Sequence, residues 1–302
     1  MGTLNFYRLI LVILLVLVWG FNFVVIQIGL DGLPPIFLAF TRFFLTSLPA
    51  IFFFKRPKVP FYRIVFYGIT IFALQFALFF IGMKMGVPPG LAAILMQVHV
   101  FFSLALAAFL FHEKIKPWQV AGAIIAFAGV SYAGTHVEGT LSLPGFFLII
   151  GAAALWGIGS AVSKSLGKVN MVALVVWGSM VAWPILLLCS LLLEGPHVIL
   201  SSLENLSWSS FGAVLYLTYL STLFGFALWS WLLHHLPLST VAPFTLMVPI
   251  IAMLSSVLVI GEPLQPWKIG AALLVIGGLA INFLGALVFA KKKKNSDSTL
   301  LQ

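Results

Sequence analysis

The chain has 302 residues, of which 62% are hydrophobic and only 8% are charged, and its formal net charge is +9. Soluble domains carry about 25% charged residues, so this composition excludes a soluble globular fold. The basic residues gather in short segments between apolar stretches and in the C-terminal tail, which excludes a nucleic-acid footprint and is typical of membrane topology. We therefore expect a polytopic membrane protein.

Apolar segments of about 20 residues, each able to cross roughly 30 Å of hydrocarbon, follow one another along the chain. Prolines mark most segment boundaries, where a missing N–H does least harm. Only the connection Glu194–Ser209 has room for a small surface element. The expected fold class is an all-α polytopic membrane protein with ten transmembrane helices, at Leu9–Leu30, Pro35–Phe54, Ile64–Met83, Gly90–Phe111, Pro117–Gly134, Pro144–Leu166, Met171–Leu193, Ser210–Leu233, Ser239–Ile260 and Pro266–Phe289.

The N-terminal segment has the Arg8-then-apolar pattern of a signal peptide, but it continues to Leu30 with no small-residue cleavage site, so we expect a retained first helix. Loop charges indicate the orientation. If the N-terminus is cytoplasmic, only Lys84 and Lys268 among the loop cations lie outside. The positive-inside rule therefore predicts that both termini are cytoplasmic. The tail 290–302, with Lys291–Lys294, is expected to anchor this topology, and contact with anionic membrane lipids is compatible with it.

The chain contains an internal repeat. The stretch from Glu113 to Trp118 recurs as Glu262 to Trp267, and Pro88 matches Pro237 in the same register. The halves are 1–134 and 144–289, with five predicted helices each. Because five is odd, the second half must be inserted upside down. Inverted repeats place a binding site near the membrane midplane and supply two related conformations, which predicts alternating access.

Several motifs carry a family resemblance. They are Trp19-Gly20-Phe21-Asn22-Phe23, Pro34-Pro35 with Arg42-Phe43, Gly90-Leu91-Ala92 with Gln97, the Glu113 loop, Trp156-Gly157 with Lys164, Val241-Ala242-Pro243 with Pro249, and Glu262. From these the chain resembles the EamA family of the drug/metabolite transporter superfamily, and most of all bacterial O-acetylserine and cysteine exporters. The resemblance implies a multi-pass protein of the bacterial inner (plasma) membrane that exports small amino-acid metabolites.

Arg42 is the one basic residue deep inside a predicted span. A charge at that depth costs roughly 2.5–3.5 kcal/mol even on lenient insertion scales. A guanidinium also offers paired donors that suit the carboxylate of an amino-acid cargo. The alternative is a structural or gating role, in which Arg42 bonds helix-end carbonyls or extends outward.

Other polar or aromatic residues inside spans are candidates for the substrate site, namely Asn22, Gln75, Gln97, Trp19, Trp156 and Ser160. Hydrogen bonds between helices are the alternative for the amides, and packing or interface positions explain most tryptophans. His99 is a candidate proton carrier. Its alternative is a neutral histidine bonded to a neighbouring helix.

Glu113, Glu262 and Pro249 are candidate gating residues, because the glutamates are repeat-related and end helices while Pro249 can kink one. The sequence shows no catalytic set, no metal ligands and no phosphate-binding glycine loop. We therefore predict a secondary transporter and not an enzyme, with no cofactor and no nucleic-acid partner. The expected partners are a small amino-acid derivative and lipids, with protons left open. The alternatives are a broad exporter of aromatic or amphipathic compounds and, remotely, an intramembrane enzyme or receptor.

Overall fold

The computed structural model describes residues 5–136, 142–167 and 169–299, with side chains placed except at 111, 238, 239, 242 and 287–299. The regular structure of these ranges is helical throughout. The α-helices are α1 (Phe6–Gly32), α2 (Pro35–Ser47), α3 (Phe61–Tyr67), α4 (Gln75–Lys84), α5 (Pro89–Met96), α6 (His99–Phe111), α7 (Pro117–Gly134), α8 (Leu143–Ser165), α9 (Met171–Leu193), α10 (Pro196–Glu204), α11 (Trp208–Leu215), α12 (Gly225–His235), α13 (Leu238–Thr245), α14 (Met247–Ile260) and α15 (Pro266–Thr299). The 3-10 segment η1 (Ala50–Phe52) and the π-helical segments η2 (Gly68–Leu74) and η3 (Tyr216–Phe224) complete the set.

Within the described ranges, nine helical stretches are long and apolar enough to cross a membrane. They correspond to nine of the ten predicted spans. The remaining segment, α7, has the necessary 18 residues but includes Gln119, Ser131 and Tyr132, and it is not among the nine. The all-helical multi-pass prediction is therefore confirmed, whereas the count of ten spans stays a prediction.

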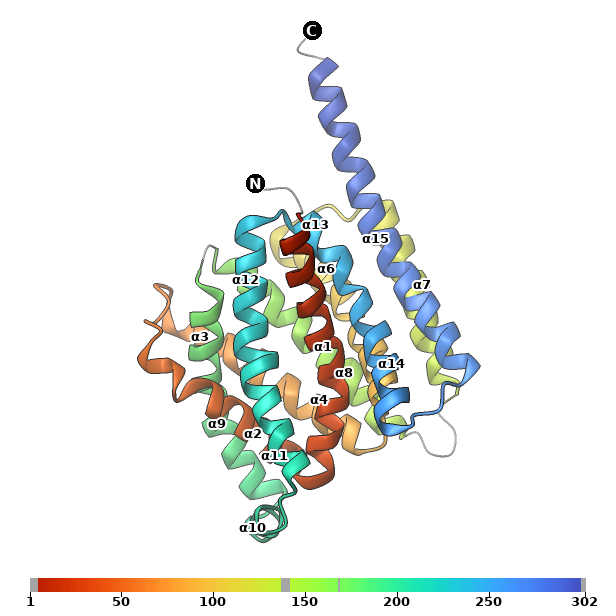
Figure 1. The fold of residues 1–302 in the computed structure, drawn as a ribbon. Coiled ribbons are helices and arrows are strands. Elements are labelled where there is room, and N and C mark those ends of the chain that lie inside the picture. Colours follow the sequence, from red (N-terminus) through yellow and green to blue (C-terminus); the bar gives the residue numbers. More distant parts are fainter. Residues whose placement is uncertain (1–4, 137–141, 168, 300–302) are drawn as a thin grey trace.

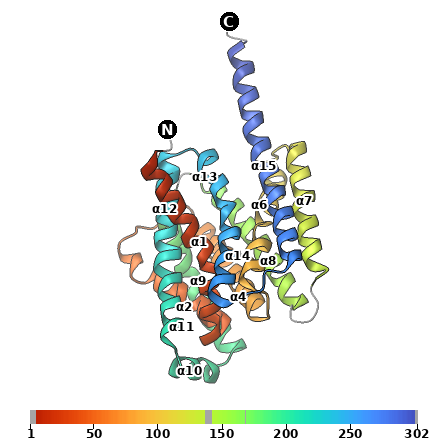
Figure 2. The ribbon, with the colours of Figure 1, turned by 45° about the vertical axis from the view of Figure 1, so that its right-hand side comes forward.

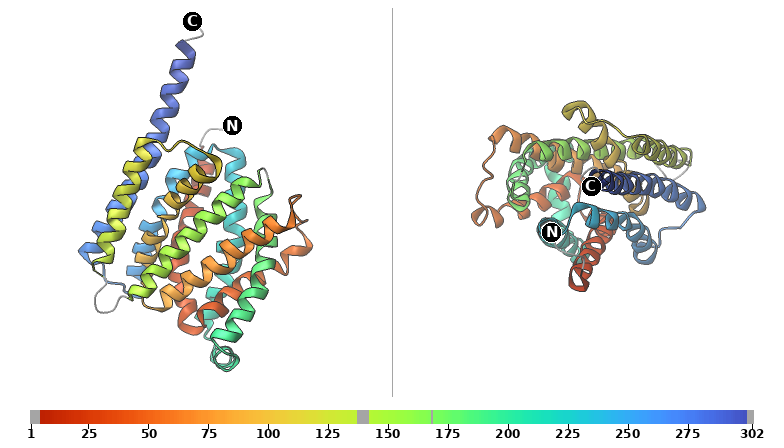
Figure 3. Two further views of the ribbon diagram at one scale, coloured as in Figure 1. Left: turned by 180° about the vertical axis from the view of Figure 1, so that it is seen from behind. Right: turned by 90° about the horizontal axis from the view of Figure 1, so that it is seen from above.

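The helices form one bundle in which α1 begins at the same end as the final turns of α15, which project beyond the other helices (Figures 1 and 2). The first helix after the midpoint, α8, begins at the opposite end (Figure 3). The short α10 lies across that opposite end (Figure 1), inside the connection predicted to hold a surface element. The C-terminal segment 290–302 is helical as far as Thr299, and residues 300–302 lie outside the described chain.

Four predicted spans are interrupted instead of running as continuous α-helices. The π segment η2 interrupts the third span, and η3 interrupts the eighth. The fourth breaks at Gln97–Val98, between α5 and α6, and the ninth breaks at Leu246, between α13 and α14. The breaks fall at matching places in the two halves, because Gln97 follows Pro88 at the spacing that separates Leu246 from Pro237.

Pro249 explains the break in the ninth span. It stands in the first turn of α14, where its missing N–H and its ring prevent the helix from continuing through the preceding turn. The predicted kink therefore lies at Leu246, just before the proline. The matching break at Gln97–Val98 has no proline near it, and nothing in the local sequence explains it.

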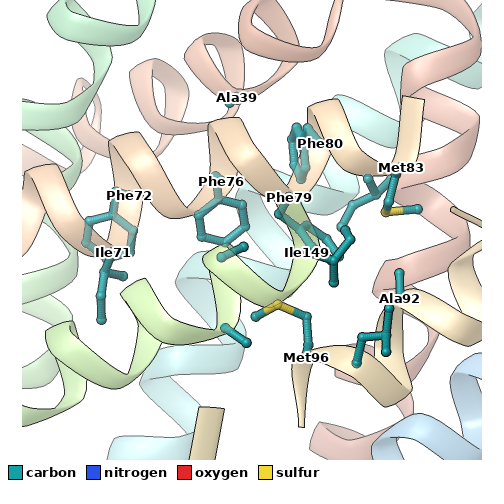
Figure 4. Packing of buried hydrophobic residues seen from close by; sticks show 14 of the residues in the cluster. Ala39, Ile71, Phe72, Phe76, Phe79, Phe80, Met83, Ala92, Met96 and Ile149 are labelled. Atoms are coloured by element: carbon teal, nitrogen blue, oxygen red, sulfur yellow. The ribbon is translucent and has the colours of Figure 1, made fainter. Parts of the chain in front are cut away.

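The main apolar core surrounds η2 and α4. Phe72 and Phe76 follow one another along this span, and Ile149 of α8 and Met96 of α5 belong to the same cluster (Figure 4). The ring of Phe43 on α2 meets that of Phe76 edge to face, with 4.9 Å between the ring centroids. Because α4 packs against both α2 and α8, this core holds Arg42 of α2 facing the interior.

A second contact joins the last helices of the two halves. Helices α7 and α15 lie along one another (Figure 2), and they approach so closely that a methyl group on Gly122 would strike the carbonyl of Gly278, and the reverse. A methyl group on Gly129 would lie 3.0 Å from the carbonyl oxygen of Ala271. Small residues of this kind permit close helix approach inside membranes.

Candidate substrate-binding site

Arg42 is buried, with only 3% of its surface exposed. Its Nε donates to Thr222 Oγ1 at 3.0 Å, and its Nη2 donates to Ser221 Oγ at 3.3 Å. The guanidinium lies over the ring of Phe76, 4.6 Å from the centroid. The predicted alternative in which Arg42 extends outward is therefore wrong for this conformation, because the side chain is held between α2, α4 and η3.

Ser221 connects this arginine to the first helix. Its hydroxyl donates to Asn22 Oδ1 at 2.6 Å, and its carbonyl accepts a hydrogen bond from Trp19 Nε1 at 3.2 Å. Trp19, Asn22 and Arg42 were all predicted for one site, and the structure brings them together. We call Trp19, Asn22, Arg42, Ser221 and Thr222 the Arg42 cluster.

Ser221 and Thr222 were not predicted. Two adjacent hydroxyls in an apolar span are a weak signal, since such residues often bond their own helix backbone. The π-helical turn of η3 decides their role, because it changes which faces of the span successive residues occupy. Thr222 Oγ1 accordingly donates to the carbonyl five residues earlier, at Leu217, while it accepts from Arg42.

The Arg42 guanidinium has no anionic partner within the part of the chain that the structure describes. The two ion pairs found there join Lys164 to Glu113 and Lys268 to Glu262. Arg42 Nη1 is buried without any hydrogen-bond partner. The ring of Phe76 compensates the charge only in part. A buried cation with a free donor is an incomplete site, and a carboxylate would complete it.

His99 lies in a different environment. Its ring centroid is 5.8 Å from that of Trp156, and its Nδ1 is buried without a partner. Ser160 donates its hydroxyl to the carbonyl of Trp156 at 2.8 Å. We call His99, Trp156 and Ser160 the His99 cluster. Its members come from α6 and α8, whereas the Arg42 cluster comes from α1, α2 and η3. Among the described residues, no hydrogen bond or ring contact joins the two clusters.

The two predicted glutamines differ. Gln75 begins α4, next to Phe76, and is buried with its Oε1 unpaired. It is thus adjacent in the chain to the ring that covers Arg42. Gln97 is half-buried at the break between α5 and α6 and belongs to neither cluster.

The predicted gating glutamates have opposite surroundings. Glu262 is buried and accepts hydrogen bonds from the backbone N–H of Gly90 at 3.1 Å, from Lys268 Nζ at 2.8 Å and from the Ser256 hydroxyl. Glu113 is exposed and pairs with Lys164.

Glu194, which was not predicted for the site, positions the arginine helix. Its carboxylate accepts from the N–H groups of Ile36 at 2.6 Å and Phe37 at 3.0 Å, at the start of α2. A carboxylate at a helix N-terminus accepts hydrogen bonds from backbone N–H groups that have no partner within the helix. Its negative charge also interacts favourably with the positive end of the helix dipole. No signal in the sequence pairs this loop residue with α2. Among the described residues, no group of three or more His, Cys, Asp or Glu side chains could hold a metal ion.

Comparisons with known proteins agree with the two-part organisation. The EamA-like transporter family matches residues 7–135 and, a second time, residues 143–284. A probable amino-acid metabolite efflux pump of Salmonella typhimurium is 39% identical over 285 residues, which cover 91% of this chain and 94% of that protein. A pump of the same description from Escherichia coli is 36% identical and covers 91% of this chain and 94% of its own length. One solved structure, 18% identical, superimposes with a TM-score of 0.63 over 92% of this chain and 96% of its own, which shows a shared fold.

Proposed function

We propose, from the premise that the chain belongs to the EamA-like transporter family, that it is an inner-membrane secondary transporter that exports small amino-acid metabolites of the cysteine and O-acetylserine type. Family membership and the apolar helices indicate a multi-pass transporter rather than an enzyme. The names of the relatives from Salmonella typhimurium and Escherichia coli support amino-acid metabolites as the cargo class.

The single observation that carries the proposal is the buried, anion-free guanidinium of Arg42. In our proposal the cargo carboxylate binds Arg42 Nη1, the donor that has no partner. Ser221 and Thr222 hold the other guanidinium nitrogens, so the free donor is fixed in direction before cargo arrives. Asn22 and Trp19 fix Ser221 in turn. The unpaired Oε1 of Gln75 supplies an acceptor for the cargo ammonium group.

Alternating access between inverted halves is the transport mechanism we propose. Three observations support it. The family matches each half separately. The π segments and the helix breaks recur at matching places, and α1 and α8 begin at opposite ends of the bundle (Figures 1 and 3). In this proposal α7 is the tenth span, both termini are cytoplasmic in a bacterial cell, and Glu113, Glu262 and Pro249 serve the gates.

Counterflow in proteoliposomes tests the proposal, with labelled O-acetylserine and cysteine as probes. We expect saturable exchange in the wild type and a loss of at least about tenfold in Arg42→Gln, because a buried charge pair contributes more than 1.4 kcal/mol. Arg42→Lys keeps the charge without the planar fork and should lose less. Arg56→Gln, which removes an exposed arginine, is the matched control and should exchange normally. A folded wild type that exchanges neither probe would overturn the cargo assignment.

The aromatic wall beside Arg42 favours a second candidate, export of aromatic or amphipathic metabolites. The rings of Phe43 and Phe76 both lie within 6 Å of the guanidinium carbon, at 5.7 and 4.6 Å. Competition of labelled O-acetylserine by unlabelled phenylalanine distinguishes the two. Stronger inhibition by phenylalanine than by cysteine would favour the aromatic cargo.

A further inference from the structure

Glu113 and Glu262 occupy the same position of the two repeats but have opposite surroundings. The side chain of Glu113 is 48% exposed, and among the described residues its ion-pair partner is Lys164, whose side chain is 52% exposed. The Glu262 side chain is 6% exposed, and Lys268, its ion-pair partner, is buried with it. The two glutamates are repeat counterparts, so the same surroundings would be expected for both. Their different burial therefore indicates that the two ends of the molecule are packed differently.

Glu262 ties the two halves together at its end. It belongs to the second half, yet it accepts a hydrogen bond from Gly90 N–H in the first turn of α5, which belongs to the first half. The position suits a carboxylate because it lies at a helix N-terminus. Gly90 fits closely, since a methyl group there would lie 3.1 Å from Glu262 Oε2.

The packing of the helices that these glutamates face shows the same difference. Every residue of α5 is buried, and α5 packs on α14 of the other half. Its repeat counterpart is α13, which begins after Pro237 as α5 begins after Pro88. Pro243, Phe244 and Thr245 of α13 are only half-buried, and the described residues of α13 have no comparable packing on α6. One end is therefore closed, and the equivalent closure is missing at the other.

We propose that Glu262 and Glu113 are alternating locks, and that this structure is the state closed at the Glu262 end. This inference rests on the proposed alternating access. When the Glu113 end closes, Glu113 leaves Lys164 and binds the N-terminus of α13, as Glu262 now binds α5. At the same time Glu262 releases Gly90, and α5 separates from α14. The two contacts cannot form at the same time. Weakening the Glu262 contact therefore raises the population of the state closed at the Glu113 end, and weakening the Glu113 contact does the reverse.

Chemical labelling of two variants, each with one introduced cysteine, tests the locks without any transported probe. The natural Cys189 is first replaced by alanine. A cysteine is then placed at Leu91 or at its repeat counterpart Thr240, which are buried and half-buried respectively. Both ends face solvent in a nanodisc, so reaction with a hydrophilic maleimide reports which end is open. We expect Thr240→Cys to react and Leu91→Cys to be protected.

Glu262→Gln should raise the labelling rate of Leu91→Cys by at least about tenfold, because one partner of a buried ion pair is lost. It should also lower the rate at Thr240→Cys. Lys268→Gln should act in the same direction more weakly, and it serves if Glu262→Gln does not fold. Adding Glu113→Gln to Glu262→Gln should return Leu91→Cys towards protection, since the competing lock is then lost as well.

Asp31→Asn is the matched control, because Asp31 is an exposed carboxylate whose hydrogen bond, from Gln27 Nε2 at 3.1 Å, stays within α1. It should change neither labelling rate. Higher labelling at both cysteines in Glu262→Gln would mean local loosening and would overturn the locks. Continued protection of Leu91→Cys, or no effect of Glu113→Gln, would overturn them too. Since no cargo is used, a wrong cargo in the counterflow assay leaves these outcomes unaffected.

Discussion

The Arg42 cluster and the His99 cluster place an ionisable side chain inside the bundle in two different ways. Arg42 is bonded by Ser221 and Thr222, and Phe76 lies under its guanidinium, yet the charge has no anion in the described structure. His99 lies beside Trp156, with the two rings tilted by 44°, and among the described residues its Nδ1 has no partner. An arginine cannot shed its charge in a protein, whereas an imidazole can stay neutral. In our proposal the first cluster therefore binds an anion, whereas the second cluster can remain neutral.

Removing the cation altogether gives the largest expected effect. Arg42→Met should abolish counterflow and also raise the free energy of unfolding by about 1–4 kcal/mol, because an apolar side chain replaces an uncompensated buried charge. Ser221 keeps its bond to Asn22, and Thr222 keeps its bond to Leu217, so few groups lose their partners. Thermal unfolding in detergent measures the stability. A destabilised Arg42→Met would show that the guanidinium is structural.

The hydroxyl that orients Arg42 should have a smaller effect. Ser221→Ala removes the bond to Arg42 and the bond to Asn22, so we expect KM for O-acetylserine to rise about fivefold, as befits the loss of about 1 kcal/mol. Thr218→Val is the matched control from the same π segment, because the Thr218 hydroxyl is buried without a partner. Its KM should be unchanged. An equal rise in both variants would indicate a general disturbance of η3.

His99→Gln should have the smallest effect on exchange at equal pH, no more than about twofold, because no hydrogen bond to the ring is lost. If His99 carries a coupling proton, the same variant should lose the stimulation of uptake by a proton gradient. Uptake into proteoliposomes with and without the gradient separates the two effects. If the proton gradient still stimulates uptake in His99→Gln, His99 does not carry the coupling proton, and of the two ionisable residues Arg42 alone would have a transport role.

The sequence predicted those parts of the fold that hydrophobicity and proline control. The start of α7 at Pro117 and of α15 at Pro266 follows from proline at the first helical position. Arg42, Asn22 and Trp19 could be assigned to one site because each is unusual in an apolar span or belongs to a shared motif. Pro249 correctly marked a break in its helix.

What the sequence did not predict depends on contacts between distant segments. Nothing local marks η2 or η3 as π-helical, so Ser221 and Thr222 could not be placed beside Arg42. The break at Gln97 has no proline. Glu194 binds the start of α2 at Ile36, which lies 158 residues earlier in the sequence. Such contacts are determined by the packed bundle, and neither hydrophobic periodicity nor motif spacing contains them.

The close approach of α7 and α15 has a consequence for the origin of the chain. In the register that matches Glu113 to Glu262, Gly122 of α7 corresponds to Ala271 of α15, and Gly129 corresponds to Gly278. Gly122 meets Gly278 and Gly129 meets Ala271, so the same two repeat positions are in contact twice, with the roles of the two helices exchanged. Reciprocal contacts of this kind are the mark of an isologous interface, in which one surface patch is complementary to itself. A self-complementary patch needs no second gene to evolve. A single five-helix ancestor could have assembled through it as a homodimer before duplication and fusion joined the two copies in one polypeptide.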